Sequence, residues 1–138
     1  MSTQKINFVS PDEAVRLIES GDHVYIQGST SIPEVLCEAL ARRGNELKDV
    51  TLYSAFAVAK GPAPYCKPEF KDTFLVNSFF VSNSVRKWIA EGYGVTTPRF
   101  LGEVPELFRD GTCRVDVALI NCSEPDEEGY VSLSLIHI

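Results

Sequence analysis

Residues 23–44 read HVYIQGSTSIPEVLCEALARRG, and this stretch decides the fold class. A short apolar strand ends in a glycine and small hydroxyl residues, and an amphipathic helix from about Pro33 to Arg43 follows. Gly44 is the stop signal of that helix. The apolar positions expected to face the core are Val35, Leu36, Ala39 and Leu40. A strand that leads through a tight turn into a helix is the repeating unit of α/β folds.

The rest of the chain repeats this alternation. A helix is expected over residues 10–22, with Ser10 as its cap, Pro11 at its first position and Gly21 at its end. Its apolar face consists of Ala14, Val15, Leu17 and Ile18. Further strands are expected at 50–54, 74–81, 97–101 and 115–121, helices at 84–92 and 103–111, and a long structured loop at 55–72. Because the strands are apolar runs, we predict an α/β domain with a mostly parallel sheet and helices on both faces.

Composition excludes several classes of function. Among 138 residues, 13 are basic and 19 acidic, which gives a net charge of −6 and no basic surface for nucleic acid or anionic membranes. No apolar run approaches the roughly 20 residues of a membrane span, and the start lacks the pattern of a signal peptide. Without a CxxC pair, and with two histidines, a metal site is not expected, so reduced, mostly buried thiols in a cytoplasmic protein are predicted. These thiols are Cys37, Cys66, Cys113 and Cys122.

The turn from Gln27 to Thr30 is the first candidate site. Gly28 permits a tight turn and close approach of a ligand to the backbone, and Ser29 and Thr30 add hydroxyl donors. A helix start at the end of a strand is where α/β folds present N–H groups to an anion. The alternative is that Ser31 only caps the helix, with the glutamate three residues later as its partner. Both interpretations stay open on spacing alone.

A second polar turn, Ser82-Asn83-Ser84, joins another strand to another helix, whose first turn carries Arg86. Two such turns at the carboxyl ends of parallel strands should line one crevice, where these folds usually bind ligands. Arg86 is a candidate for holding a carboxylate, although a solvated helix arginine is the more common arrangement.

An acidic stretch and the histidines complete the candidates. The spacing of the carboxylates matches no calcium loop, and an acidic turn over Pro125–Gly129 explains them adequately. A serine hydrolase is disfavoured because GxSxG is absent and His23 and His137 are the only bases. The carboxylates are Glu124, Asp126, Glu127 and Glu128.

Together these segments resemble the amino-terminal domain of the acetyl-CoA hydrolase/transferase family, with the 4-hydroxybutyrate and butyryl:acetate CoA-transferases most similar. The resemblance covers nearly all of residues 8–133 in four ordered motifs. It implies the CoA-transferase superfold. The motifs are VYIQGSTSIPEVLCEALARRG (24–44), GPAPYCKPEFKDTFLVNSFFVSNSVRKWIAEG (61–92), TPRFLGEVPELFRDG (97–111) and VDVALINCSEPDEEGYVSL (115–133).

The resemblance implies transfer of coenzyme A from an acyl-CoA to a small carboxylic acid. In the family, a glutamate attacks the thioester, forms an acyl-glutamyl anhydride and becomes a glutamyl-CoA thioester. That glutamate lies in a Glu-x-Gly context in the carboxyl-terminal domain. Glu127-Glu128-Gly129 is locally similar but corresponds to a turn of the first domain, so no catalytic residue is assigned here. Acyl-CoA is a substrate, and no cofactor is expected to be permanently bound.

The substrate-binding residues follow from matching the family motifs. The loop from Gln27 to Pro33 matches the first active-site loop, and the turn before Arg86 matches a second. Ser82 stands where the family usually has glycine, and Ser84 where it has asparagine, which weakens the assignment of substrate contacts near Arg86. The assigned residues are Gln27, Gly28, Ser29, Thr30, Asn83, Ser84 and Arg86.

The chain is expected to be the front of a longer protein. Residues 1–132 would form the amino-terminal domain, and the carboxyl-terminal catalytic domain would be absent. Residues 133–138, LSLIHI, match one frame of a sequencing-adapter string and are expected to be an artefact. The full enzyme is expected to be a homo-oligomer, and the fragment inactive. Two alternatives stay open: an acetyl-CoA hydrolase, and a non-catalytic binding domain that needs a partner subunit.

Overall fold

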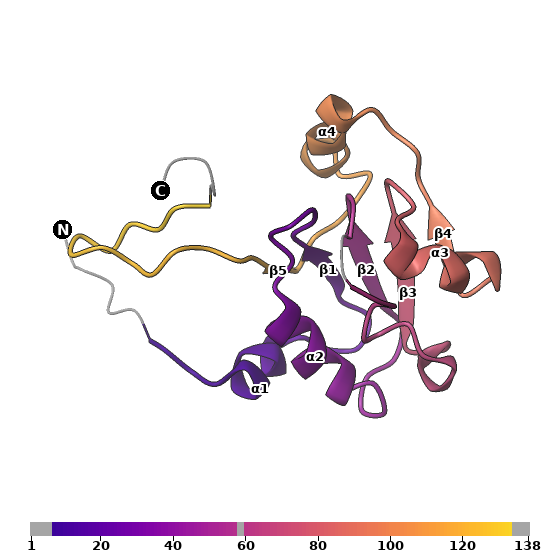
Figure 1. Cartoon of the computed structure of the whole chain (residues 1–138), viewed down its shortest axis with the longest axis horizontal. Coiled ribbons are helices and arrows are strands. Elements are labelled where there is room, and N and C mark those ends of the chain that lie inside the picture. The colour runs from indigo at the N-terminus through magenta and orange to yellow at the C-terminus, as the bar shows by residue number, and fades with distance from the viewer. Residues whose placement is uncertain (1–6, 58–59, 134–138) are drawn as a thin grey trace.

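The computed structural model describes residues 7–57 and 60–133, which alternate between strands and helices (Figure 1). The helices are α1 (Pro11–Ala14), α2 (Glu34–Arg42), α3 (Asn83–Ala90) and α4 (Val104–Arg109). The strands are β1 (His23–Ile26), β2 (Val50–Ser54), β3 (Phe74–Ser78), β4 (Gly94–Thr96) and β5 (Val117–Leu119). Single 3₁₀ turns are η1 (Val15–Leu17), η2 (Pro68–Phe70) and η3 (Leu101–Glu103).

The five strands form one sheet in the order β4-β3-β2-β1-β5, and every pairing is parallel. Tyr25 of β1 lies opposite Tyr53 of β2, which lies opposite Asn77 of β3. Parallel neighbours need crossover connections, and α2, α3 and the long loop after β2 supply them. The predicted α/β fold is therefore confirmed, with a sheet that is parallel throughout the described residues.

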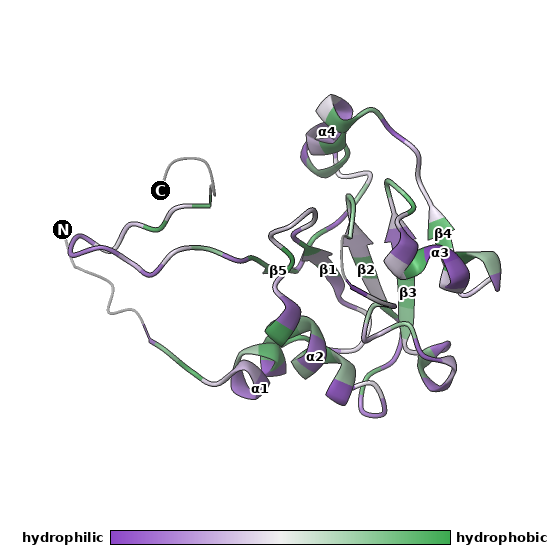
Figure 2. Cartoon of the chain, viewed as in Figure 1, coloured by the Kyte–Doolittle hydropathy of each residue, from purple (hydrophilic) through white to green (hydrophobic). Residues whose placement is uncertain are grey.

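The main core lies on one face of the sheet. The side chains of Val24, Leu52 and Val76 point to this face and are fully buried beneath η1, α2, α3 and the loop between β2 and β3. Figure 2 shows apolar (green) segments along β3, and apolar segments that alternate with hydrophilic (purple) ones along the helices. On the opposite face, α4 packs Val104 and Leu107 against a smaller cluster around Tyr53. Helices therefore cover both faces, although α4 is short.

Some local predictions are wrong. No strand spans 97–101; β4 ends at Thr96 because Pro98 has no N–H to donate to a ladder. The first helical segment ends at Leu17, well before Gly21, because Ile18 is already extended. Leu17 and Val35 are exposed rather than in the core.

All four cysteines are free thiols. Cys37 and Cys113 are buried, Cys66 is half-buried and Cys122 is exposed. Burial raises the pKa of the Cys37 and Cys66 thiols to about 12, so both stay protonated and unreactive at neutral pH.

Beyond β5 the chain leaves the domain as an extended arm (yellow in Figure 1). The arm turns back on itself through the acidic stretch. The Asp126 carboxylate accepts hydrogen bonds from the N–H groups of Glu128 (2.9 Å) and Tyr130 (2.8 Å), and Gly129 has a φ of 87°. The acidic turn predicted from the sequence is confirmed. Residues 134–138, with His137, lie outside the described part of the chain.

Candidate functional site

The loop after β1 is held by the segment that follows β2. The Ser29 N–H donates to the Phe56 carbonyl at 2.5 Å, and Ser29 forms an isolated parallel bridge with Ala57. A Cβ on Gly28 would lie 2.8 Å from the Phe56 carbonyl oxygen and 3.0 Å from its nitrogen. The close approach that requires glycine here is therefore made by the protein's own backbone.

Gln27 connects this loop to the end of β5. Its N–H donates to the Leu119 carbonyl at 3.0 Å, and its side-chain Oε1 accepts from the Asn121 N–H at 2.6 Å. Two hydrogen bonds therefore fix the backbone and the side-chain oxygen of Gln27. The side-chain NH₂ keeps its donor capacity at the carboxyl edge of the sheet.

The interpretation of Ser31 as a helix cap is wrong. Helix α2 begins at Glu34 and has Pro33 at its N-cap position, without a side-chain cap. The hydroxyls of Ser29 and Thr30 are likewise not used to cap α2.

A cleft of about 420 Å³ opens where β1, β2 and β3 end. Gln27, Gly28 and Ser29 line it from the first loop, as predicted for the carboxyl edge of a parallel sheet. The other lining residues gave no signal as site residues in the sequence. Tyr25 belongs to β1 and Leu101 to η3. The other three follow strands: Ala55 and Phe56 follow β2, and Phe80 follows β3.

The second polar turn lies at the same edge but lines a different space. Strand β2 separates β1 from β3, and Phe80, not the polar turn, extends from β3 into the cleft. Ser84 is buried and lines a narrower cavity of about 230 Å³ with Cys37 and Tyr65. Asn83 and Arg86 are exposed on α3.

Thr30 is also outside the cleft. It is exposed and lines a shallow hollow of about 440 Å³ with Pro33 and Asn121. The seven assigned residues therefore lie along one edge of the sheet, and three of them share the cleft.

The cleft carries no charged side chain among its lining residues. Burial raises the pKa of Tyr25, so its hydroxyl stays neutral and can donate a hydrogen bond. A wider hollow of about 760 Å³ adjoins the cleft at Phe80. Its lining includes one cation, Arg99, and three carboxylates, Glu103, Glu106 and Asp110.

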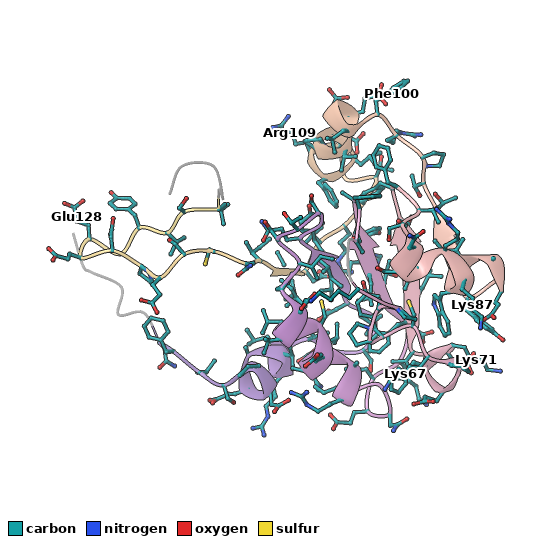
Figure 3. The ribbon with its side chains drawn as sticks, in the orientation of Figure 1. Lys67, Lys71, Lys87, Phe100, Arg109 and Glu128 are labelled. Carbon is teal, nitrogen blue, oxygen red and sulfur yellow. The ribbon has the colours of Figure 1, made fainter. Side chains whose placement is uncertain are left out.

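The labelled charged side chains lie at two ends of the molecule. Figure 3 shows Phe100 and Arg109 at the α4 end of the molecule, whereas Lys67, Lys71 and Lys87 lie toward the opposite end of the sheet. Over residues 7–57 and 60–133, no three His, Cys, Asp or Glu side chains gather as a metal site would require. Within the same residues, no helix has the length and apolar character to cross a membrane.

His23 is the first residue of β1, and its Nδ1 lies 3.0 Å from the Tyr53 hydroxyl.

Comparison with known proteins adds sequence and structural relatives. Residues 3–136 match the model of the acetyl-CoA hydrolase/transferase N-terminal domain. The chain is 36% identical over 124 residues to a succinyl-CoA:acetate/propanoyl-CoA:succinate CoA transferase of Fasciola hepatica, covering 88% of this chain and 25% of the relative. It is 34% identical over 131 residues to a 4-hydroxybutyrate coenzyme A transferase of Clostridium kluyveri, and the match covers 95% of this chain and 30% of the relative.

Solved structures agree with this relationship. RipA from Yersinia pestis superimposes with a TM-score of 0.77 at 26% identity, over 92% of this chain and 31% of RipA. A 4-hydroxybutyrate CoA-transferase from Porphyromonas gingivalis superimposes with a TM-score of 0.66 at 27% identity. The match covers 91% of this chain and 27% of that transferase. The chain thus spans about a quarter to a third of the length of these relatives.

Proposed function

The chain belongs to the acetyl-CoA hydrolase/transferase family as its N-terminal domain, and we propose that it forms one wall of the active site of a CoA-transferase. The full enzyme would move coenzyme A between a short-chain acyl-CoA, such as acetyl-, 4-hydroxybutyryl- or butyryl-CoA, and a carboxylic acid. The relatives named for 4-hydroxybutyrate and for butyryl-CoA:acetate transfer support this choice of substrates. We expect the enzyme to act in the cytoplasm as a homo-oligomer.

One observation carries the proposal: three residues of the loop that resembles the family's first active-site loop, Gln27, Gly28 and Ser29, line the cleft at the carboxyl ends of β1, β2 and β3. We assign substrate contacts to Gln27, Gly28, Ser29 and Thr30 in this loop. Contacts from the α3 side are assigned to Asn83, Ser84 and Arg86, which lie along the same edge.

The covalent chemistry is assigned to a segment outside this chain. A glutamate of the carboxyl-terminal domain would attack the thioester carbonyl and expel the CoA thiolate, which leaves an acyl-glutamyl anhydride. The thiolate would then attack the glutamyl carbonyl and release the first carboxylate, leaving a glutamyl-CoA thioester. Since no such glutamate is assigned here, residues 1–132 should bind substrate without turnover.

The first test is to sequence the source DNA beyond the codon for Ser132 and to express the complete open reading frame. We expect a second domain with a Glu-x-Gly nucleophile and transfer of CoA from butyryl-CoA or acetyl-CoA to a free acid. Release of free CoA without an acceptor acid would identify a hydrolase instead. A natural stop close to residue 138 would remove the catalytic proposal and favour a binding role with a partner subunit.

The assignment of the first loop can be tested by Thr30→Val in that enzyme. This exposed hydroxyl is not used by α2, so its removal should leave folding intact and lower kcat/KM by about 10-fold if it donates to the substrate. Thr51→Val, on the face of β2 away from the main core, is the matched control and should keep full activity. Equal activity of both variants would exclude Thr30 from the substrate contacts.

A further inference from the structure

The cavity of about 230 Å³ beside Cys37, Tyr65 and Ser84 lies between α2 and the proline-rich loop that follows β2. Its volume is below the roughly 300–1,000 Å³ of pockets that hold drug-sized ligands, so it fits only a small molecule. Among the described residues, none lines both this cavity and the cleft at the carboxyl ends of β1, β2 and β3. The cavity is therefore a separate space with its own chemistry.

Three charged side chains form the rim of this cavity. Glu34 and Glu38 of α2 and Lys60 of the loop line it and are exposed. Within residues 7–57 and 60–133, none of the three has an ion-pair partner. The two glutamates are four residues apart on one face of α2, and like charges at this spacing destabilise a helix. The pKa of the Cys37 thiol is raised mainly by burial and further by both carboxylates, which places their charge beside the cavity.

The deeper part of the cavity is neutral. Cys37, Ala63 and Tyr65 line it and are each at most 5% exposed. Pro62 and Pro64 add further apolar atoms to its wall. A ligand therefore meets charge at the rim and uncharged surface below it.

The Tyr65 hydroxyl is a polar group without a partner. The residue is 2% exposed, and in the described part of the chain its hydroxyl makes no hydrogen bond. Burial raises the pKa of Tyr65 well above its ordinary value, so the hydroxyl stays neutral and can donate. Buried hydroxyls usually have a partner, because the hydrogen bonds lost to water must be replaced. Since Tyr65 lines the cavity, a ligand there can supply the missing acceptor.

We propose that this cavity binds a small amino acid in its zwitterionic form. The ammonium group pairs with Glu34 and Glu38, and the carboxylate pairs with Lys60. The uncharged side chain enters the neutral part, where its oxygen accepts a hydrogen bond from Tyr65. A simple amine or a simple acid would leave part of the rim unpaired. The inference goes beyond the proposed function, because this ligand is neither an acyl-CoA nor an acceptor acid of the transfer.

L-Threonine is the probe, because it carries both charges and a side-chain hydroxyl. Isothermal titration calorimetry of the complete protein, without acyl-CoA, should show binding of L-threonine at least about 10-fold tighter than that of 1-amino-2-propanol, which lacks the carboxylate. L-Valine, which has a methyl group in place of the hydroxyl, should bind about 10-fold more weakly than L-threonine. Tyr65→Phe should remove this difference.

Charge variants test the rim. Lys60→Gln should weaken the binding of L-threonine by at least about 10-fold and leave that of 1-amino-2-propanol unchanged, whereas Glu38→Gln should weaken both. Lys48→Gln and Glu13→Gln are the matched controls and should not change either affinity. Both residues are exposed and lie outside the cavity lining, and neither has an ion-pair partner in the described residues.

Two results would overturn the inference. One is the absence of L-threonine binding at millimolar concentration, or equal affinity for L-threonine and 1-amino-2-propanol. The other is an unchanged affinity in folded Lys60→Gln and Glu38→Gln variants. Cooperative thermal unfolding of each variant shows that a lost affinity does not come from a lost fold. Because the titration involves no CoA transfer, its result is separate from the test of the proposed function.

Discussion

Gly28→Ala should destabilise the protein because the space for a side chain is occupied by backbone. The added Cβ would lie 2.8 Å from the Phe56 carbonyl oxygen, a contact that can be relieved only by moving one of the two segments. Overpacking of this kind costs about 1–3 kcal/mol. The movement also stretches the 2.5 Å hydrogen bond from the Ser29 N–H to the same oxygen, which is worth about 1 kcal/mol.

The free energy of unfolding should therefore fall by about 2–4 kcal/mol. In a urea titration followed by circular dichroism, this lowers the midpoint by about 1–2 M, given a slope of about 2 kcal/mol per molar urea. Gly61→Ala is the control, because nothing lies within 4 Å of its Cβ position. It should shift the free energy by less than about 0.5 kcal/mol. Equal midpoints for the two variants would refute the reasoning from backbone contact.

Three further predictions concern polar groups. Thr73→Val should cost about 1–3 kcal/mol in urea unfolding, since the buried hydroxyl donates to the Gly44 carbonyl at 2.7 Å, whereas Thr73→Ser should retain most of the stability. A hydrogen bond from the first backbone N–H of β1 lowers the pKa of Asp116 below its ordinary value, so its stabilisation is present above that value and lost as the pH falls through the lowered pKa. Asp116→Asn should therefore be less stable than the parent at pH 7, and thermal melts of the two should converge once the pH falls below the lowered pKa. Iodoacetamide at pH 8 should label Cys122 quickly and Cys37 only on unfolding, as mass spectrometry of the peptides can show.

The sheet was predictable because its signals are local. Each of β1, β2 and β3 is a short apolar run flanked by turn or helix residues, and parallel pairing follows from the helices and long loop between them. β4 was not predictable from its own residues. Gly94, Val95 and Thr96 carry little strand signal, and their pairing with β3 depends on a close approach in which a Gly94 Cβ would lie 2.8 Å from the Val76 carbonyl oxygen.

The site was only half predictable, because local sequence signals identify the first loop but not the lining residues that folding brings to it. The loop from Gln27 to Ser29 was predictable because a glycine and a hydroxyl residue follow a strand, and this loop lines the cleft. Phe56 and Leu101 belong to segments that read as loop and strand in the sequence, and only the folded chain brings them to the same edge. Asn83 and Arg86 satisfied the pattern of an anion-binding turn, yet of the segment after β3 only Phe80 lines the cleft, and Ser84 of the turn lines a separate cavity.

The pair Phe79-Phe80 shows how the core of the second face and the cleft depend on each other. The two residues follow Ser78, the last residue of β3, in a bend, and as chain neighbours they share one stretch of backbone. Phe79 is 2% exposed and stacks beside Tyr53, with ring centroids 6.1 Å apart, while Phe108 of α4 meets Phe79 edge-on at 5.9 Å. Burial of Phe79 beneath α4 leaves Phe80, at 39% exposure, to face the cleft. The packing of α4 therefore sets the position of a cleft residue that α4 does not itself supply. Phe108→Ala removes the edge-on contact with Phe79, so it should lower the free energy of unfolding and shift Phe80, although no lining residue of the cleft is changed; urea unfolding and a crystal structure of the variant would show both effects.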